Sequence, residues 1–444
     1  MFRRGLFIFA HQIGDYRFYS SYKKYEKNQW RTNSELRAGQ DVQLRRMINY
    51  VYNNVPYYHK VFKGLDIMPG EIKNVSDLER LPILTKDIIK RNWEDFKPKN
   101  LKSMKYYEIS TGGSTGTPFR YRLSKYDRFL SGAMLYRGWG YAGYQLGDKM
   151  IFLAGSSLDI GSKSIIIKRA HEISRNIRKL SSFDMSICDL QKYIQIFNSF
   201  RPKYLRGYAS SINFFANYIK ENNIKIEPIS GVLTTAEKLL PNMRENIENT
   251  FGCDIYDGYG LNDGGVGAYE CSEHSGLHID MERSIMEIVD KKGHQMEDGV
   301  GSILATSLYN YAMPFIRYET GDLGHIIPTN CGCGRGSRLL KEIVGRSVDV
   351  LVTPEGKSIH GWFFLYIFWE YGKGIKEYQV VQEKLDKVVI EIVPEDKFDE
   401  RQLDEIMKAI RKRSSSWNIE FKLVDKIKRT SGGKYKFIVN GLDL

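Results

Sequence analysis

The residues with the clearest chemical signature are the glycines and hydroxyl side chains between Ser110 and Pro118, in the run STGGSTGTP. Glycines let backbone N–H groups approach an anion closely, and serine and threonine hydroxyls donate hydrogen bonds to phosphoryl oxygens. The run is therefore typical of a phosphate-binding loop, although a flexible surface loop has the same composition. It is not a Walker loop, because Gly116 is followed by Thr117 and Pro118 where that motif needs lysine and a hydroxyl residue.

Four later segments carry side chains that would complete a nucleotide site. In the first, Tyr259 offers a ring that stacks on a base, and the nearby Asp263 offers a carboxylate for a magnesium ion. Asp322 closes the run RYETGD and is suited to accept hydrogen bonds from both hydroxyls of a ribose. Arg346 and Lys434 each follow a glycine, the lysine in the tail segment TSGGK. Taken singly, each of these segments also fits an ordinary turn or a solvated loop tip.

A second group of residues has the spacing of metal ligands. Cys331 and Cys333 form a tight pair of thiols in a glycine-containing loop, and Cys271 lies before two histidines. Either His274 or His278 would complete a tetrahedral zinc site with three cysteines and one histidine. The sequence therefore predicts a metal centre assembled from two separated half-sites.

The composition is that of an ordinary globular chain. Its 444 residues, 42% apolar and 13% aromatic, suffice for about two or three domains. The formal charge of +13 favours anionic partners, which include nucleotides, acidic metabolites, nucleic acid and anionic lipid surfaces. Given the motifs of a nucleotide site, we expect no nucleic acid among the partners. The five cysteines form no disulfide framework and their odd number indicates a reducing cytoplasm; Cys188 and Cys253 are expected in the core.

The N-terminal segment is apolar from Leu6 to Ala10 but meets His11 before it reaches the length of a signal sequence. No segment approaches the roughly 18 uninterrupted apolar residues of a transmembrane helix. We expect the aromatic residues of this segment to pack onto the body of the protein. The alternative is a weak peripheral contact with the inner face of the membrane, because Arg3 and Arg4 flank the apolar run.

The first 345 residues alternate between helical and strand patterns. Residues 36–52 carry apolar side chains at helical spacing up to a stop at Pro56, and Ser210 precedes a second amphipathic run as its expected cap. Short apolar runs at 150–154 and 229–234 are typical of buried strands. This order predicts α/β layering.

The pattern changes beyond Gly345 and Arg346, which is the expected domain boundary. Residues 378–382 and 388–393 alternate around a polar turn and predict a β-hairpin, which a helix near 403–410 and a strand at 419–424 follow. We therefore expect an N-terminal domain over residues 1–346 and a compact α+β domain over residues 347–444.

The order of these motifs resembles that of the adenylate-forming superfamily of acyl-CoA synthetases and related ligases. The closest likeness is to its branch of phenylacetate-coenzyme A ligases and CapK-like capsule-synthesis proteins, over about residues 36–440. The shared strings are NVPYY at 54–58, LPILTK at 81–86, EC at 270–271 with GLH at 276–278, AMPFIRY at 312–318 and CGCGR at 331–335.

This resemblance implies a large N-terminal α/β domain, a small mobile C-terminal domain and a reaction in two steps. A carboxylate attacks the α-phosphorus of ATP to give an acyl-adenylate and pyrophosphate, and then the thiol of coenzyme A or an amine displaces AMP. Both steps need charge neutralisation and positioning, which a magnesium ion, a lysine and many hydrogen-bond donors supply. The expected partners are thus ATP, a small carboxylic acid and an acceptor. The oligomeric state can be either a monomer or a homodimer.

The resemblance also assigns roles to residues of this chain. The β- and γ-phosphates are held by Thr111, Gly112, Gly113, Ser114, Thr115 and Gly116. The adenosine is held by Thr235, Ala236, Glu237, Tyr259 and Gly260 around the adenine, with Asp322 and Arg346 at the ribose. Asp263 binds Mg²⁺, and Lys434 bridges the substrate carboxylate and the α-phosphate during adenylation only. A structural Zn²⁺ is bound by Cys271, His278, Cys331 and Cys333.

Some residues depart from the superfamily pattern. Asp263 stands where glutamate is usual, Gly112 replaces a serine, and Phe119 and Arg120 replace a lysine after the loop proline. Val348 falls at the position of an acidic hinge residue. The competing hypothesis is a non-catalytic, zinc-stabilised protein that binds acidic polymer or nucleic acid through its basic surface. The ligase is favoured because nearly all the nucleotide residues are present, and the capsule-type strings indicate surface polysaccharide synthesis.

Overall fold

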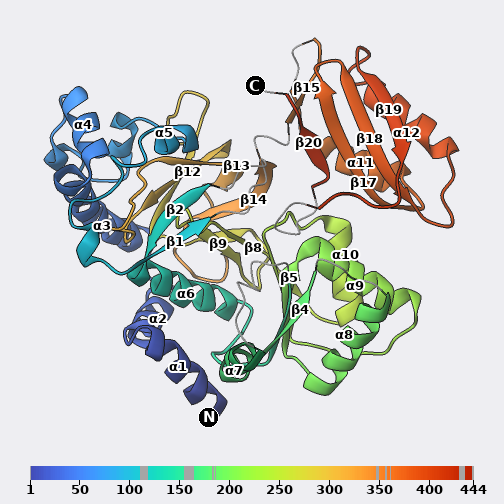
Figure 1. Cartoon of the computed structure of the whole chain (residues 1–444), viewed down its shortest axis with the longest axis horizontal. Helices are drawn as coiled ribbons and strands as arrows, with labels where there is room; N and C mark the ends of the chain where they lie inside the picture. Colours follow the sequence, from blue (N-terminus) through green and yellow to red (C-terminus); the bar gives the residue numbers. More distant parts are fainter. Residues whose placement is uncertain are drawn as a thin grey trace. The chain divides into compact units, whose positions relative to one another are not determined.

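The protein has a mixed α/β fold, which confirms the predicted class. The computed structural model describes residues 2–110, 119–154, 165–182, 185, 187–346, 350–355, 358–360, 362–429 and 436–442. These residues form two compact units, Met1–Val344 and Gly345–Leu444 (Figure 1). Each unit has hydrophobic clusters of its own.

Helices dominate the first hundred residues. They are α1 (Phe2–Gly14), α2 (Phe18–Asn28), α3 (Asn33–Asn54), α4 (Pro56–Gly64) and α5 (Lys86–Arg91). The helix predicted at 36–52 is confirmed as α3, which begins with a capping box between Thr32 and Glu35. Its predicted apolar face is fully buried. Pro56 ends α3 as expected and also opens α4, where its missing N–H costs nothing.

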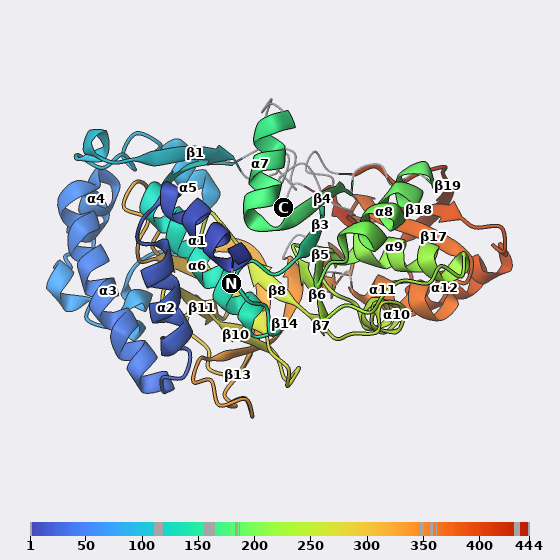
Figure 2. The ribbon, with the colours of Figure 1, turned by 90° about the horizontal axis from the view of Figure 1, so that it is seen from below.

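A parallel five-stranded sheet forms the middle of the first unit, in the order β4-β3-β5-β6-β7. Its strands are β3 (Met150–Ala154), β4 (Ile177–Ser181), β5 (Tyr204–Tyr208), β6 (Gly231–Thr235) and β7 (Ile255–Tyr256). One face packs on α8 (Ile187–Phe200), α9 (Ala209–Glu221) and α10 (Pro241–Phe251) (Figure 2). The other face, with Met150, Tyr204 and Leu233, packs on α6 (Lys125–Gly140). Helix α7 (Ile165–Arg175) precedes β4.

Two expectations about this region are wrong. Ser210 lies inside α9 and does not cap it; its backbone N–H instead donates a hydrogen bond of 3.0 Å to the Glu237 carboxylate. Cys188 is exposed, because it lies in the first turn of α8 outside the face that Leu190 and Phe197 bury. Cys253 is partly buried against the cluster beneath α8, α9 and α10.

Residues 258–346 form a second, antiparallel sheet that contains no helix, so the alternation predicted up to residue 345 is wrong for this segment. Its order is β11-β12-β13-β14-β10-β9-β8. The strands are β8 (Gly258–Gly260), β9 (Gly267–Glu270), β10 (Leu277–Ile279), β11 (Ser284–Val289), β12 (Gly299–Ser307), β13 (Tyr318–Ile327) and β14 (Leu339–Arg346). Much of it is buried on both faces, which removes the alternation of apolar and polar residues that marks a strand.

A separate hairpin carries the glycine- and hydroxyl-rich loop. Strands β1 (Tyr106–Ser110) and β2 (Arg120–Ser124) pair antiparallel, with Ser110 opposite Arg120. Residues 111–118, which connect them, lie outside the described residues. The loop is thus the connection of a hairpin, with its two ends side by side.

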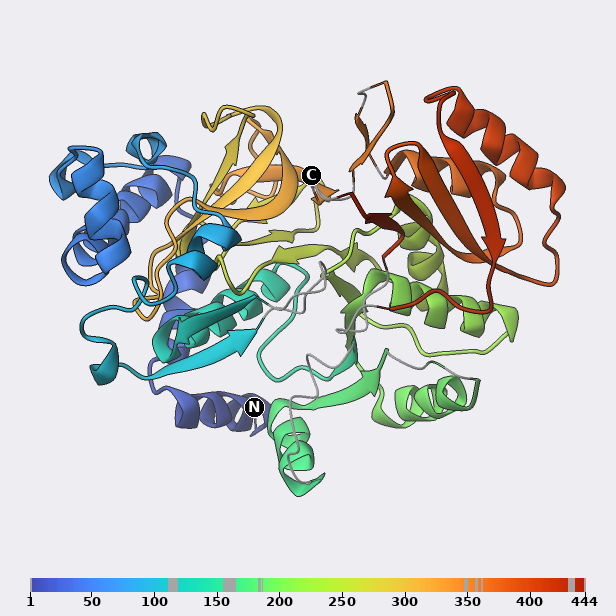
Figure 3. The ribbon, with the colours of Figure 1, turned by 45° about the horizontal axis from the view of Figure 1, so that its top comes forward.

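The second unit is built on a four-stranded sheet in the order β19-β18-β17-β20 (Figure 3). Its elements are β15 (Val350–Val352), β16 (Ser358–His360), α11 (Trp362–Tyr371), β17 (Ile375–Lys384), β18 (Lys387–Pro394), α12 (Arg401–Arg411), β19 (Asn418–Leu423) and β20 (Ile438–Asn440). The predicted hairpin, helix and strand are confirmed as β17 with β18, α12 and β19. Helix α11 was not predicted, and with α12 it contributes to one apolar core with the sheet.

Helix α1 has one side that packs onto the body of the protein and another that is exposed, so it bears on both interpretations of the N-terminal segment: internal packing and a peripheral membrane contact. Phe7 is buried and its ring stacks on His11, as expected for packing onto the body. Phe9 and Ile13 are exposed on the same helix, at 63% and 73% of their surface. In the described part of the chain, we find no helix with the length and apolar character needed to cross a bilayer.

His11 makes the packing of α1 sensitive to acid. Its Nδ1–H donates to the Phe7 carbonyl at 2.9 Å, and Nε2 accepts from the Tyr136 hydroxyl at 3.0 Å, which requires a neutral ring. Burial and the nearby Arg175 charge lower the pKa of His11 from 6.5 to about 4. The unfolded chain therefore takes up a proton first, and the folded state loses stability as the pH falls from 6.5 towards 4.

We expect this loss to reach about 2–3 kcal/mol at pH 4.5 relative to pH 7. The measurement is urea unfolding of the wild type and of His11→Phe at both pH values, with the exposed His294→Gln as control. His11→Phe should lack this part of the decline, whereas His294→Gln should follow the wild type. An equal decline in all three proteins would contradict the role of His11.

Candidate functional site

The downstream end of the glycine- and hydroxyl-rich loop is anchored beside Asp263. Phe119, the first described residue after the loop, is buried and stacks on Tyr318 with 6.1 Å between the ring centroids. The Tyr318 hydroxyl donates a hydrogen bond of 2.7 Å to Asp263 Oδ2. Tyr121, on β2, lies within electrostatic reach of the same carboxylate, and its buried hydroxyl has no hydrogen-bond partner among the described residues. The stem of the loop thus lies next to the acid predicted to bind magnesium.

A second buried carboxylate is held in the same way. The Tyr259 hydroxyl, on β8, donates to Asp322 Oδ2, on β13, at 2.9 Å. Asp322 and Asp263 are each 6% exposed. Burial, with the carboxylate beside each ring, raises the pKa of Tyr259 and of Tyr318 far above the usual range, so both remain hydrogen-bond donors. The structure therefore brings together two predicted acids, each oriented by a tyrosine.

The end of β6 adds a buried acceptor to this region. Thr235 ends the strand, Ala236 has a left-handed backbone with φ 65°, and Glu237 follows. Glu237 Oε2 accepts from the Ser210 N–H, whereas the buried Oε1 has no partner within the described ranges. Ligands of parallel sheets bind beyond the carboxyl ends of the strands, which is where this oxygen lies.

Some predicted residues are not placed. The loop residues Thr111 to Gly116 and Lys434 lie outside the described residues. Arg346 is the last residue of β14, and only its backbone is described. Gly260 lies in β8 and pairs with Gly267 of β9. The roles assigned to these residues stay predictions.

The tyrosine that holds Asp263 was missed in the sequence. Tyr318, Thr320 and Asp322 occupy alternate positions of β13 and are all buried. Alternation with period two marks side chains on one face of a strand. Counting back from Asp322 in steps of two residues leads to Thr320 and Tyr318, and this spacing is the signal that would have identified Tyr318.

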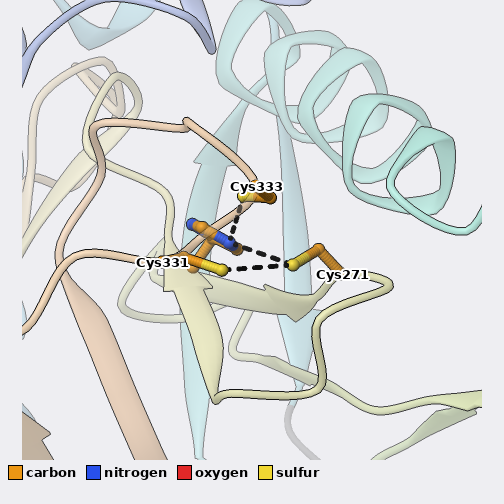
Figure 4. A group of neighbouring side chains, drawn as sticks. Cys271, Cys331 and Cys333 are labelled. Carbon is orange, nitrogen blue, oxygen red and sulfur yellow. Dashed lines mark hydrogen bonds between the residues drawn. The ribbon is translucent and has the colours of Figure 1, made fainter.

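Three cysteines and one histidine meet in a cluster, with their ligand atoms within 4.8 Å of one another. Figure 4 shows the side chains of Cys271, Cys331 and Cys333 pointing toward one another. The sulfurs of Cys271 and Cys331 are 3.6 Å apart, and His278 Nε2 lies 3.4 Å from the Cys271 sulfur and 3.3 Å from that of Cys333. Ligands around a tetrahedral zinc lie roughly 3.6–3.8 Å from one another, so the cluster fits that ion.

The state of these side chains also suits a metal. Burial, with the Arg335 and Arg137 charges, lowers the pKa of His278 to about 4, which keeps the imidazole in its ligating neutral form. The His278 Nδ1 lies 3.0 Å from the Ser337 hydroxyl, a contact that orients the ring. Burial opposes ionisation of Cys333, but hydrogen bonds from Arg335 outweigh it and lower the pKa of that thiol.

His274, the other histidine considered, belongs to a different group. Its Nδ1 lies 3.0 Å from Glu270 Oε1, and its ring packs against Tyr256. It lies in the turn between β9 and β10, whereas His278 lies on β10. The hairpin therefore directs the two side chains to different places.

Comparisons with known proteins agree with this arrangement. Residues 351–441 match the family model of the CapK C-terminal domain. Protein CapK of Staphylococcus aureus is 25% identical over 440 residues, which cover 95% of this chain and 94% of that protein. Phenylacetate-coenzyme A ligase of Thermus thermophilus is 24% identical and covers 82% of each chain.

Solved structures with the same fold include 2-hydroxyisobutyryl-CoA ligase in its postadenylation state with 2-HIB-AMP. That structure has a TM-score of 0.72 at 17% identity and covers 92% of this chain and 90% of that one. Anthranilate CoA ligase with anthranoyl-AMP covers 74% of this chain and 64% of that one, with a TM-score of 0.53 at 15% identity. The chain is thus similar in sequence to protein CapK and to phenylacetate-coenzyme A ligases over most of its length, and it has the fold of adenylate-forming ligases.

Proposed function

We propose that the protein is an ATP-dependent, AMP-forming carboxylate ligase. The observation that carries the proposal is the pair of buried carboxylates, Asp263 and Asp322, each held by a tyrosine hydroxyl beside the stem of the glycine- and hydroxyl-rich loop. Relatives named as CoA ligases support this activity. They favour coenzyme A as the acceptor over an amine.

The described residues suit nucleotide binding. Asp322 accepts hydrogen bonds from the ribose hydroxyls, and Glu237 Oε1 accepts from an N–H of the base. Asp263 fits Mg²⁺, because this hard cation is bound through one or two carboxylates and the phosphates, and no described residue donates to Asp263 Oδ1. Bound there, the ion would neutralise phosphate charge. Tyr318 keeps the Asp263 carboxylate aimed at the phosphates.

The remaining roles rest on the family resemblance. Thr111 to Gly116 bind the β- and γ-phosphates, Arg346 assists at the ribose, and Lys434 stabilises the charge of the adenylation step. The small C-terminal domain moves between the two half-reactions and withdraws Lys434 from the second. In support, 2-hydroxyisobutyryl-CoA ligase has been crystallised in both a postadenylation and a thioesterification state.

We further propose that the cluster of Cys271, His278, Cys331 and Cys333 binds a structural Zn²⁺. With four protein ligands the ion keeps no open position for chemistry. It would tie the β9–β10 hairpin to the segment between β13 and β14, and thereby support both strands that carry Asp322 and Tyr259. The resemblance to capsule-synthesis proteins suggests a role in surface polysaccharide synthesis, and the arginines beside the apolar N-terminal run suggest a peripheral contact with the inner face of the membrane.

The test is acid-dependent exchange of labelled pyrophosphate into ATP, across aryl acids, uronic acids and amino acids. We expect one class of acid to support exchange and coenzyme A to discharge the adenylate. If none of these acids supports exchange, the ligase function is rejected and the non-catalytic binding protein is favoured.

Asp322→Asn is expected to raise the KM for ATP roughly 10- to 100-fold, because a charged acceptor for the ribose hydroxyls is lost. The wild type should prefer ATP over 2′-deoxy-ATP by a similar factor, and the variant should lose that preference. Asp290→Asn, in an exposed turn of the same unit, serves as control. A preference that survives in Asp322→Asn would place the ribose elsewhere.

A further inference from the structure

One face of the parallel sheet carries an arginine that no described carboxylate neutralises. Arg206 lies in β5 beside Phe152 of β3, two residues before β5 ends. Its guanidinium carbon lies 5.1 Å from the Trp139 ring centroid and 5.4 Å from that of Phe152. Among the described residues, none makes an ion pair or hydrogen bond with this guanidinium. The rings fix the plane of the cation but leave its charge and its N–H donors unsatisfied.

Three arginines of the same unit that are more fully buried than Arg206 are neutralised. Arg137 donates to Glu282 at 2.9 Å, Arg283 makes two bonds to Asp127 at 2.9 and 2.8 Å, and Arg317 donates to Glu287 at 3.1 Å. A desolvated charge without a partner is costly, so its partner normally folds with it. Among the described residues Arg206 departs from this pattern, and its N–H donors suit an anionic ligand.

A second cation lies in the same surroundings. Arg175, the last residue of α7, is partly buried, and its one described contact is a hydrogen bond of 3.4 Å to the neighbouring Ser174 hydroxyl. Both Arg175 and Arg206 lie within electrostatic reach of the Tyr136 hydroxyl. Burial lowers the pKa of both arginines, and no described aspartate or glutamate offsets that effect.

The position of Arg206 relates it to the proposed substrate. Arg206 is the middle residue of β5 and pairs with Leu233 of β6; Thr235 ends β6 and Glu237 follows it. The carboxyl edge of a parallel sheet is where ligands bind, and an aromatic wall with a few fixed polar groups is typical of a small-molecule site. The acid to be activated would thus extend along Trp139 and Phe152 toward the two arginines.

We propose that Arg206 and Arg175 bind a second anionic group on the substrate acid, so that the enzyme activates acids that carry a distal carboxylate or phosphate. The inference rests on the proposed ligase function and names its substrate class. Arg206 lies beside the contacting rings of Trp139 and Phe152, and its guanidinium is a planar fork that matches either oxyanion. Arg175 adds a second positive charge within electrostatic reach of the same Tyr136 hydroxyl.

The experiment measures kcat/KM in pyrophosphate exchange for acids matched in skeleton: hexanoate against adipate, and 4-methylbenzoate against terephthalate and 4-phosphonobenzoate. The wild type should prefer a doubly charged acid over its singly charged match roughly 10- to 100-fold. Preference for terephthalate or for 4-phosphonobenzoate then distinguishes carboxylate from phosphate. Arg206→Met should abolish the preference, Arg206→Lys should restore part of it, and Arg175→Gln should reduce it.

Arg178→Met is the matched control, since Arg178 lies on strand β4 of the same sheet and is paired with Glu172. It should keep the wild-type preference. If singly charged acids are used equally well, or if Arg206→Met lowers exchange with both kinds of acid by the same factor, the inference is wrong and the ligase function stands. If none of these acids nor the wider panel supports exchange, the ligase function itself fails.

Discussion

Replacing Lys434 by alanine should lower acid-dependent pyrophosphate exchange by at least about 100-fold, because the charge that develops at the α-phosphate loses its stabilising cation. ATP binding, measured by calorimetry, should change less than about threefold, since the loop and Asp322 remain. Removal of one preorganised donor commonly costs a rate factor of about 100 to 1,000. The measurement is exchange at saturating ATP and acid.

Two further measurements make this expectation specific. Acyl-adenylate supplied directly should react with coenzyme A at near the wild-type rate in Lys434→Ala, because the lysine serves only the first half-reaction. Lys426→Ala, an exposed lysine of the same tail, should leave both half-reactions unchanged. Full exchange in Lys434→Ala would remove the role assigned to this lysine.

The second large effect is expected at the metal cluster. Cys271→Ser should lose the bound zinc and lower the thermal midpoint by roughly 10 °C or more, because a structural zinc contributes several kcal/mol to folding. The Cys271 sulfur is fully buried and lies within 3.6 Å of Cys331 and His278. The measurements are elemental analysis and a thermal unfolding scan.

The matched control is Cys188→Ser, which removes an exposed thiol from the same unit. It should retain one zinc per chain and the wild-type midpoint. Cys271→Ser should still catalyse exchange at low temperature, because the ion is structural. Wild-type protein purified from zinc-containing medium without metal, or a Cys271→Ser variant of unchanged midpoint, would contradict the zinc site.

Local patterns were enough for several elements. The apolar positions of α3 and α9, strand β3 and the hairpin of β17 and β18 follow from spacing along the chain, because side chains of one helix or strand face share a short period. The same reasoning failed for residues 258–346. There several strands are only three or four residues long and β11 is buried on both faces, so that β13 is the strand in which a period of two is plain.

The sequence by itself determined which chemical groups are available and in what order: a phosphate-type loop, two acids, three thiols and a terminal lysine. It could not choose between His274 and His278 on spacing alone. The fold separates them, because the hairpin holds His274 in the turn beside Glu270 and places His278 on β10 beside the cysteines. Pairing between strands far apart in sequence decides such neighbours.

The same physical reason applies to the acids and to the arginines. Only the tertiary structure shows that Tyr318 holds Asp263 and that Tyr259 holds Asp322, since these bonds join residues 55 and 63 positions apart. Only the packing of α6 on the parallel sheet shows that Arg206 lies beside the rings of Trp139 and Phe152. The sequence lists the reactive side chains, but their burial, charge pairing and orientation depend on contacts between distant residues that form only in the folded chain.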